Sequence, residues 1–280
     1  LEVCETEDYL AMLKSRTFER DGRLLVPFFA CREMARECGI SPREAELRAL
    51  ANGVCPSRYE RSLGTLGLSG QARLLSSRVA VAGCGGLGGW LTEMLARLGV
   101  GELVLADGDV FCDNNLNRQL YCEEDNLGMP KAQAAARRVE RVNGAVSAFP
   151  HVVYLDEENA PDLLSGCDLV LDALDGNRAR RAVFSACKKL GIPFVHGAIG
   201  GWYAQVSVCR PQDRPLWDRD DTPDKGIEIE TGNPTFTPPF AAAVEAAEAV
   251  KLLAGLDSVP VGELLWFDLQ RHDFQKLRMQ

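Results

Sequence analysis

The chain has 280 residues, of which 46% are hydrophobic and 25% charged, a composition typical of a globular enzyme with a sizeable core. Its formal net charge of −9 argues against a nucleic-acid or anionic-membrane partner, because both need a basic surface. No apolar run approaches the roughly 20 residues that span a bilayer. The acidic first residues also lack the basic and apolar regions of a signal peptide. These features predict a cytoplasmic protein that binds neither nucleic acid nor membrane.

The chain contains ten cysteines but no CxxC pair. Structural zinc sites usually draw their ligands from closely spaced pairs, so no zinc site is expected. In a chain without an export signal the thiols are expected to be reduced, and most of them to serve as small buried hydrophobic residues.

Residues 1–57 differ in character from the remainder and predict an N-terminal helical extension. Residues 32–39 and 41–53 have helical patterns; Ser41 is a good N-cap, Pro42 stands at the first helical position and Gly53 follows the end. We expect this extension to pack on the body of the protein. A small partner-binding module is the alternative.

From residue 78 onward, apolar runs alternate with helical patterns. Strands are expected at 78–83, 102–107, 145–154, 168–174, 193–198, 201–209 and 263–269, and helices at 86–99, 130–143, 159–166, 176–191 and 239–255. This rhythm predicts an α/β fold with a doubly wound, mainly parallel, Rossmann-like sheet and helices on both faces. Residues 58–280 are expected to form one domain, with a nucleotide half at 58–200 and a C-terminal part at 201–280.

Residues 211–239 interrupt this rhythm. The segment is rich in proline and charge and has little periodicity. A long irregular stretch inside a compact domain is more often functional or mobile than a passive connection.

The glycine run between the first two strands predicts a phosphate-binding turn. Gly83, Gly85 and Gly88 occupy the positions of a GxGxxG pattern, in which backbone N–H groups approach a phosphate at a helix N-terminus. Asp107 ends the next apolar run, 19 residues after Gly88, a spacing at which a carboxylate reaches a ribose hydroxyl. These features alone would also fit a dinucleotide-dependent oxidoreductase.

Charged residues further along the chain favour ATP over a dinucleotide. Arg118 and Lys131 would stabilise charge on a triphosphate, because nucleotidyl transfer is catalysed mainly by positioning and charge neutralisation. Asp172 and Asp175 end another apolar strand, where a carboxylate could hold Mg²⁺ beside phosphates. Asp172 could equally satisfy backbone groups. ATP and Mg²⁺ are the expected cofactors.

Five sequence elements occur in order: GCGGLG, DGD, NNLNRQ, a lysine after GMP, and DALD. Together they resemble the ubiquitin-activating-enzyme-like superfamily, in particular its bacterial MoeB/ThiF/HesA branch. The resemblance covers most of the chain after the extension. It implies an adenylyltransferase that uses ATP to adenylate the C-terminal glycine of a ubiquitin-like sulfur carrier of the MoaD or ThiS kind. Pyrophosphate would be released, and the product would serve molybdopterin or thiamine biosynthesis.

The resemblance also implies a role for individual residues. The turn around Gly86 would lie along the phosphates, and Asp107 would take the ribose. Lys131 would bind phosphate oxygens and Asp175 would hold Mg²⁺. Asn115, Arg118 and Gln119 would line the nucleotide.

Two further positions carry expectations of different kinds. Arg61, in the stretch RYER, matches an arginine that in such enzymes reaches the ATP of the partner subunit, which implies a homodimer. Asp109 could assist near the substrate carboxylate or simply turn the loop. No general base is needed, because a carboxylate nucleophile is already ionised at neutral pH.

The sequence also departs from the family pattern. Many relatives carry two zinc-binding CxxC pairs, which are missing here, and residues 211–239 contain no cysteine for covalent transfer. Two other functions stay open: a dehydratase resembling the one that acts on threonylcarbamoyladenosine in tRNA, and an NAD-dependent oxidoreductase. The acidic net charge disfavours the first, and the second leaves Arg118, Lys131 and Asp175 without a purpose.

Overall fold

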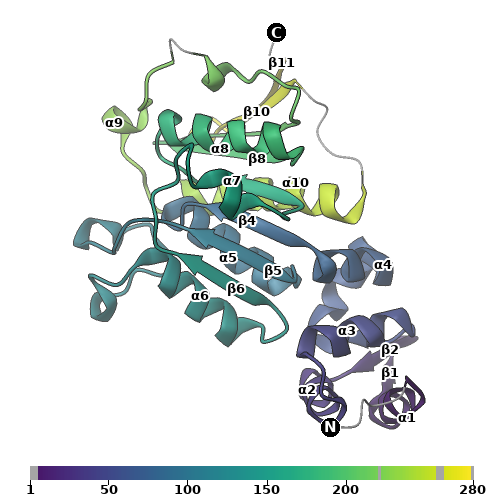
Figure 1. Cartoon of the computed structure of the whole chain (residues 1–280). Coiled ribbons are helices and arrows are strands. Elements are labelled where there is room, and N and C mark those ends of the chain that lie inside the picture. The colour runs from purple at the N-terminus through teal and green to yellow at the C-terminus, as the bar shows by residue number, and fades with distance from the viewer. Residues whose placement is uncertain (1–5, 220–221, 257–261, 279–280) are drawn as a thin grey trace.

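The computed structural model describes residues 6–219, 222–256 and 262–278, and its body is built on an eight-stranded sheet of order β11-β10-β9-β8-β7-β4-β5-β6 (Figure 1). The strands are β4 (Arg78–Ala82), β5 (Glu102–Ala106), β6 (Ser147–His151), β7 (Leu169–Asp172), β8 (Phe194–Gly200), β9 (Tyr203–Cys209), β10 (Glu263–Asp268) and β11 (Asp273–Arg278). Strands β4 to β8 pair in parallel, and β9 to β11 extend the sheet in antiparallel fashion. The predicted doubly wound, mainly parallel fold is confirmed.

Helices cover both faces of this sheet. They are α4 (Leu63–Ser76), α5 (Gly86–Leu98), α6 (Lys131–Val142), α7 (Ala160–Leu164), α8 (Asn177–Leu190), α9 (Glu228–Thr231) and α10 (Thr237–Ala254). Alternate residues of β4 serve opposite faces: Val79 and Val81 join the core under α5 and α10, while Ala80 and Ala82 join the core under α7 and α8. Both faces of the central strands are therefore buried, as parallel sheets require.

Two parts of the sheet differ from the expectation. The strand expected at 145–154 is limited to Ser147–His151, and the strand expected to be last is followed by β11, which pairs with β10 in a hairpin. His272, with φ of 55°, lies in the connecting turn, which the sequence pattern did not reveal.

Residues 6–56 form a small module of α1 (Thr6–Arg16), β1 (Phe18–Arg20), β2 (Arg23–Val26), α2 (Phe28–Cys38), α3 (Pro42–Ala51) and β3 (Cys55–Pro56). The expected N-terminal helices are present, and β1, β2 and β3 add a three-stranded sheet that the sequence analysis did not predict. Asp21 and Gly22 both have positive φ, as a two-residue hairpin turn requires. The predicted N-cap is confirmed: the Ser41 side chain accepts a hydrogen bond from the Glu44 N–H.

The module docks near the amino ends of the parallel strands, beside α4 (Figure 1). Arg43 donates to the Gly101 carbonyl at 3.0 Å and to the Glu102 carboxylate at 2.6 Å, both at the start of β5. The 3-10 helix η1 (Ser57–Ser62) contributes Tyr59, which donates to the buried Glu46 at 2.9 Å. The extension therefore packs on the body, as expected, through these polar contacts and through an apolar cluster in which Leu50 meets Leu75 and Ala145.

Among the residues that the structure describes, eight cysteines are free, and all of these except Cys112 are buried. Cys38 is disulfide-bonded, so the expectation of reduced thiols does not hold at that position. No helix in the described part of the chain is long and apolar enough to cross a membrane.

Candidate active site

A cavity of about 1380 Å³ opens at the carboxyl ends of the parallel strands. The segments that follow β4, β5, β6, β7 and β8 all contribute to its wall. In the sheet, β4 has β5 as its neighbour on one side and β7 as its neighbour on the other. Ligands of open α/β sheets bind at such a topological switch point.

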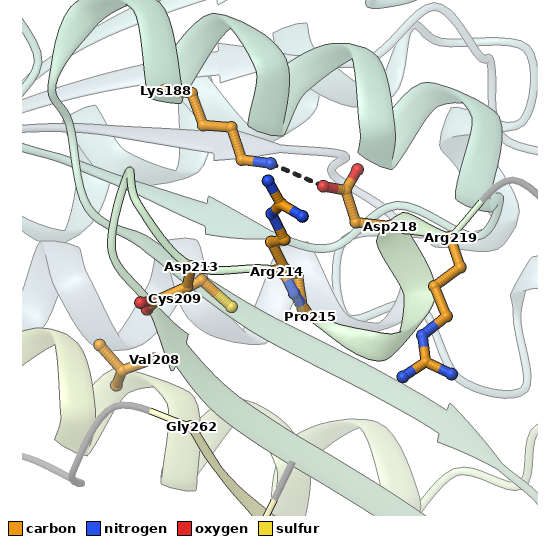
Figure 2. Close-up of a pocket in the computed structure, with 9 residues that line it drawn as sticks. All are labelled: Lys188, Val208, Cys209, Asp213, Arg214, Pro215, Asp218, Arg219 and Gly262. Atoms are coloured by element: carbon orange, nitrogen blue, oxygen red, sulfur yellow. Dashed lines mark hydrogen bonds and ion pairs between the residues drawn. The ribbon is translucent and has the colours of Figure 1, made fainter. Parts of the chain in front are cut away.

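A second cavity, of about 700 Å³, lies near the start of β8 and the end of β9, at the opposite edge of the sheet (Figure 2). Cys209 is on its wall, and Lys188 bonds Asp218 across it at 2.6 Å. None of the predicted site residues lines this second cavity. The chemistry predicted from the sequence belongs to the larger one.

The glycine turn is packed so closely that side chains are excluded. A Cβ at Gly83, whose φ is 96°, would lie 2.5 Å from the Ala173 carbonyl oxygen, and a Cβ at Gly88 would lie 1.9 Å from the Gly83 oxygen. Gly85 and Gly86 line the cavity at the start of α5, where no side chain caps the helix. The first N–H groups of this helix are suited to bind an anion.

Asp107 is bound to the same turn. Its carboxylate accepts hydrogen bonds from the backbone N–H groups of Cys84 at 2.7 Å and Asp109 at 2.8 Å. Burial raises the pKa of Asp107 despite these two donors. The residue lines the cavity, and each carboxylate oxygen retains a lone pair for a further donor such as a ribose hydroxyl.

Asp109 is the centre of a second cluster. Lys131 donates to it at 2.9 Å and the exposed Tyr154 donates at 2.8 Å. Partial burial opposes ionisation, but these two donors hold the pKa of Asp109 below its usual value. Lys131 is buried at the first position of α6 and reaches the cavity. Sequence reasoning missed Tyr154, although the strand expected at 145–154 ended on it.

The NNLNRQ stretch forms another part of the wall, with Asn115, Arg118 and Gln119 lining the cavity. Among the described residues, the Arg118 side chain donates only to neutral oxygens, the Asn114 carbonyl at 2.8 Å and the Asn117 side chain at 2.9 Å. The Gln119 Oε1 is buried without a hydrogen-bond partner among the described residues. A buried unpaired acceptor beside a cavity indicates a place for a ligand donor.

Asp175 is exposed at the cavity and Asp172 is not. The Asp175 carboxylate holds the ammonium of Lys225 at 2.8 Å, so it is accessible to a cation. Asp172 is fully buried and bonds Arg180 at 2.5 Å and His196 at 2.7 Å. Burial alone would raise the pKa of Asp172, but Arg180 and His196 outweigh this effect and lower it. Asp172 therefore does not line the cavity, and it accepts a hydrogen bond from the Leu174 N–H at 3.0 Å, as the alternative of satisfying backbone groups predicted.

Arg180 links this buried cluster to the loop that carries Asp175. It donates to the Leu174 carbonyl at 2.6 Å and to the Asn177 side chain. Burial lowers the pKa of His196, which is neutral at pH 7 and serves as a partner for Asp172. Sequence reasoning missed Arg180. The signal was available, because Arg180 lies in the first turn of the helix that follows the strand-end aspartates.

Glu245 is a further buried acid that was missed. It lies on α10 below β8, where its carboxylate fills the space that a side chain at Gly197 would need. Burial, reinforced by the nearby Asp172, raises the pKa of Glu245 well above its usual value. Glu245 does not line the cavity, and we assign it no direct contact with a ligand.

Arg61 lies outside the site. It is exposed on η1, close to the N-terminal module, and does not line the cavity of its own chain. Within one chain, the structure therefore brings together all of the predicted nucleotide-binding residues except Arg61.

The fold and this cavity define a nucleotide-binding α/β enzyme with cationic side chains around a glycine turn. The chain belongs to the ThiF family, whose model matches residues 59–280, and is an adenylyltransferase. It is 37% identical over 225 residues to the SAMP-activating enzyme E1 of Haloferax volcanii, covering 78% of this chain and 83% of that protein. It is 35% identical over 228 residues to the sulfur carrier protein ThiS adenylyltransferase of Bacillus subtilis, covering 79% and 67%.

The similarity of fold extends into the N-terminal module. The crystal structure of Escherichia coli MccB with ATP has a TM-score of 0.68 at 19% identity, covering 97% of this chain and 82% of that one. Some other relatives match the whole chain but are longer, and the chain spans 61% of their length. The module is therefore shared with other proteins, which the sequence alone did not reveal.

Proposed function

We propose that the chain adenylates the C-terminal glycine of a small ubiquitin-like sulfur carrier of the MoaD or ThiS kind. The observation that carries this proposal is the extent of the cavity. Besides the nucleotide-binding residues, it includes Tyr203, Leu264 and Trp266 on β9 and β10. Its volume of about 1380 Å³ exceeds the roughly 300–1000 Å³ of a small-molecule site. The extra space suits an extended peptide tail entering beside a bound nucleotide.

The reaction follows from the charges around the glycine turn. One oxygen of the terminal carboxylate attacks the α-phosphorus, a new oxygen–phosphorus bond forms, and the bond to the leaving pyrophosphate breaks. Both reactants are anions, so the barrier is largely electrostatic. Arg118, Lys131 and the N-terminus of α5 supply the compensating positive charge. The nucleophile is already ionised, so no general base is needed. The buried, neutral His196 is therefore not required as a base.

Asp175 fits the role of a magnesium ligand, because its exposed carboxylate already accepts a cation in the ammonium of Lys225. When bound, Mg²⁺ would neutralise phosphate charge, since it usually binds proteins through one or two carboxylates plus substrate phosphates. Asp107 would orient the ribose, and Asn115 and Gln119 would complete the wall beside it.

A direct test is pyrophosphate release from ATP and Mg²⁺ in the presence of carriers that end in Gly-Gly. We expect release that depends on the carrier and disappears when its last glycine is removed. If no such carrier supports release although ATP binds, the proposed substrate is wrong. Turnover that depends on tRNA instead would favour the dehydratase alternative. The choice between the molybdopterin and thiamine pathways would follow from which carrier is used.

We further propose a homodimer in which Arg61 of one protomer reaches the ATP of the other. The exposed position of Arg61, away from the cavity of its own chain, supports this arrangement. Arg61→Ala and Lys131→Met should each be inactive alone. When they are mixed and allowed to exchange, about a quarter of the wild-type activity should return, because half of the dimers then contain one complete site. No recovery in a mixture that demonstrably exchanges subunits would contradict the proposal.

A further inference from the structure

A turn of the irregular segment lies against the start of α8. The side chain of Asn177 donates to the Pro223 carbonyl at 2.6 Å, and the Asn177 N–H donates to the Asp224 carbonyl at 2.9 Å. The Arg178 N–H donates to the Asp224 carboxylate at 2.7 Å. These bonds hold residues 223 and 224 beside the loop that carries Asp175.

Lys225 is the next residue, and its side chain enters the cavity. Its ammonium lies 2.8 Å from the Asp175 carboxylate and donates to the Asp175 carbonyl at 3.1 Å. The positive charge of Lys225, like that of Lys131, also lowers the pKa of the Asp109 carboxyl group. The cavity thus receives a lysine from α6 and another from the irregular segment, and both face its acidic residues.

The two lysines are held differently. Lys131 is only 8% exposed and fixed by Asp109, whereas the side chain of Lys225 is 41% exposed and pairs with an aspartate that is itself open to solvent. A half-exposed ammonium can change partners at low cost, because an exposed ion pair contributes little to stability. A triphosphate, with several negative charges, would be the stronger partner.

We propose that Lys225 is a further phosphate-binding residue of this enzyme. When a nucleoside triphosphate enters, the Lys225 ammonium moves from the Asp175 carboxylate to the β- and γ-phosphate oxygens. The proposal rests on the proposed function, because it requires the triphosphate tail to lie between Lys131 and Asp175. The contacts of Asp224 with α8 keep Lys225 within reach, and its move frees the Asp175 carboxylate.

The test measures nucleotide affinity by calorimetry on the full chain, without carrier and at fixed Mg²⁺. Lys225→Met removes the charge and keeps the length of the side chain, and Lys225→Arg keeps the charge. The matched control is Lys189→Met, which removes an exposed lysine from the end of α8. ATP and AMP are compared, because only ATP carries the β- and γ-phosphates.

We expect Lys225→Met to weaken ATP binding about tenfold and to change AMP binding less than about twofold. Lys225→Arg should retain most of the ATP affinity, and the control should match the wild type. An unchanged ATP affinity in Lys225→Met overturns the proposal. Equal losses for ATP and AMP also overturn it, because they would identify Lys225 as a structural tie. Since no carrier is present, failure of the carrier assay with normal ATP binding leaves this result unaffected.

Discussion

The two edges of the central sheet use polar residues in opposite ways. At the amino edge, Glu46, Tyr59 and Asn143 are buried and bond one another, joining the N-terminal module to the body. At the carboxyl edge, the Gln119 oxygen has no partner among the described residues, and Arg118 bonds only neutral groups. The side chains named at the amino edge bond one another and hold the fold together, whereas the Gln119 oxygen and Arg118 face the cavity.

This difference predicts that substitutions at the two edges affect different measurements. A change at the carboxyl edge should reduce catalysis and leave the stability almost unchanged. A change at the amino edge should reduce the stability and leave the affinity for ATP unchanged. A variant that affected both equally would show that the two edges are coupled.

The largest effect is expected for Lys131→Met. Methionine keeps the buried stem of the side chain but removes the charge that is held at 2.9 Å by Asp109. Removing one donor that stabilises developing charge typically costs ~100- to 1000-fold in rate. We expect a loss of this size in carrier-dependent pyrophosphate release, with a melting temperature close to that of the wild type.

Lys188→Met is the matched control, because Lys188 also pairs with an aspartate, at 2.6 Å, but in the second cavity (Figure 2). It should retain the wild-type rate. If the control loses as much activity as Lys131→Met, the separation between the two cavities is wrong.

The next effect concerns stability and is expected for Asn143→Ala. The Asn143 side chain donates to the Tyr59 hydroxyl at 2.9 Å and to the Ala96 carbonyl at 3.0 Å, and it accepts from the Ala145 N–H at 3.1 Å. Truncation leaves several buried groups without partners, which should lower the free energy of unfolding by about 3 kcal/mol. Denaturant titration measures the loss, and calorimetry should give the wild-type affinity for ATP.

Asn126→Ala serves for comparison, since Asn126 makes similar local hydrogen bonds on a half-buried surface turn. It should cost about 1 kcal/mol, because water can replace the lost partners. Equal losses for the two variants would show that the buried network contributes nothing beyond its local bonds.

The sequence predicted the carboxyl edge better than the amino edge, for a physical reason. Binding a phosphate requires particular residues at fixed spacings, so Gly83, Gly88, Asp107 and Lys131 form a recognisable pattern. The bonds between Asn143 and Tyr59 join positions 84 apart in the chain and leave no local pattern. Contacts of this kind appear only when the chain is folded.

Two features that the sequence analysis did not predict were missed for different reasons. The three-stranded sheet of the module carried a readable signal, because an Asp-Gly pair such as Asp21-Gly22 is typical of a two-residue hairpin turn. Lys225 carried none, since it stands in an aperiodic segment and is brought to Asp175 by the contacts of Asp224 with α8. The interpretation that residues 211–239 are functional or mobile could therefore not single out a residue.

The smallest effect at acidic pH, and the one that best refines the comparison, is expected for Glu245→Gln, because the substitution is isosteric. Glu245 lies between the two edges, buried under β8, and no ion pair joins it to a described cation. Burial raises its pKa in the folded protein well above the value of about 4.5 in the unfolded chain. The unfolded state therefore loses its proton first as the pH rises.

The wild type should accordingly lose stability relative to Glu245→Gln from about pH 4.5 upward, until the folded carboxyl group also ionises. Well below pH 4.5 Glu245 is neutral in both the folded and the unfolded state, and the difference in unfolding free energy should be independent of pH. Melting curves of the two proteins between pH 4 and pH 8, with the exposed Glu140→Gln as control, measure this trend. A difference that stays constant over the whole range would mean that Glu245 ionises in the folded protein as readily as in the unfolded one, and that this buried position tolerates a charge.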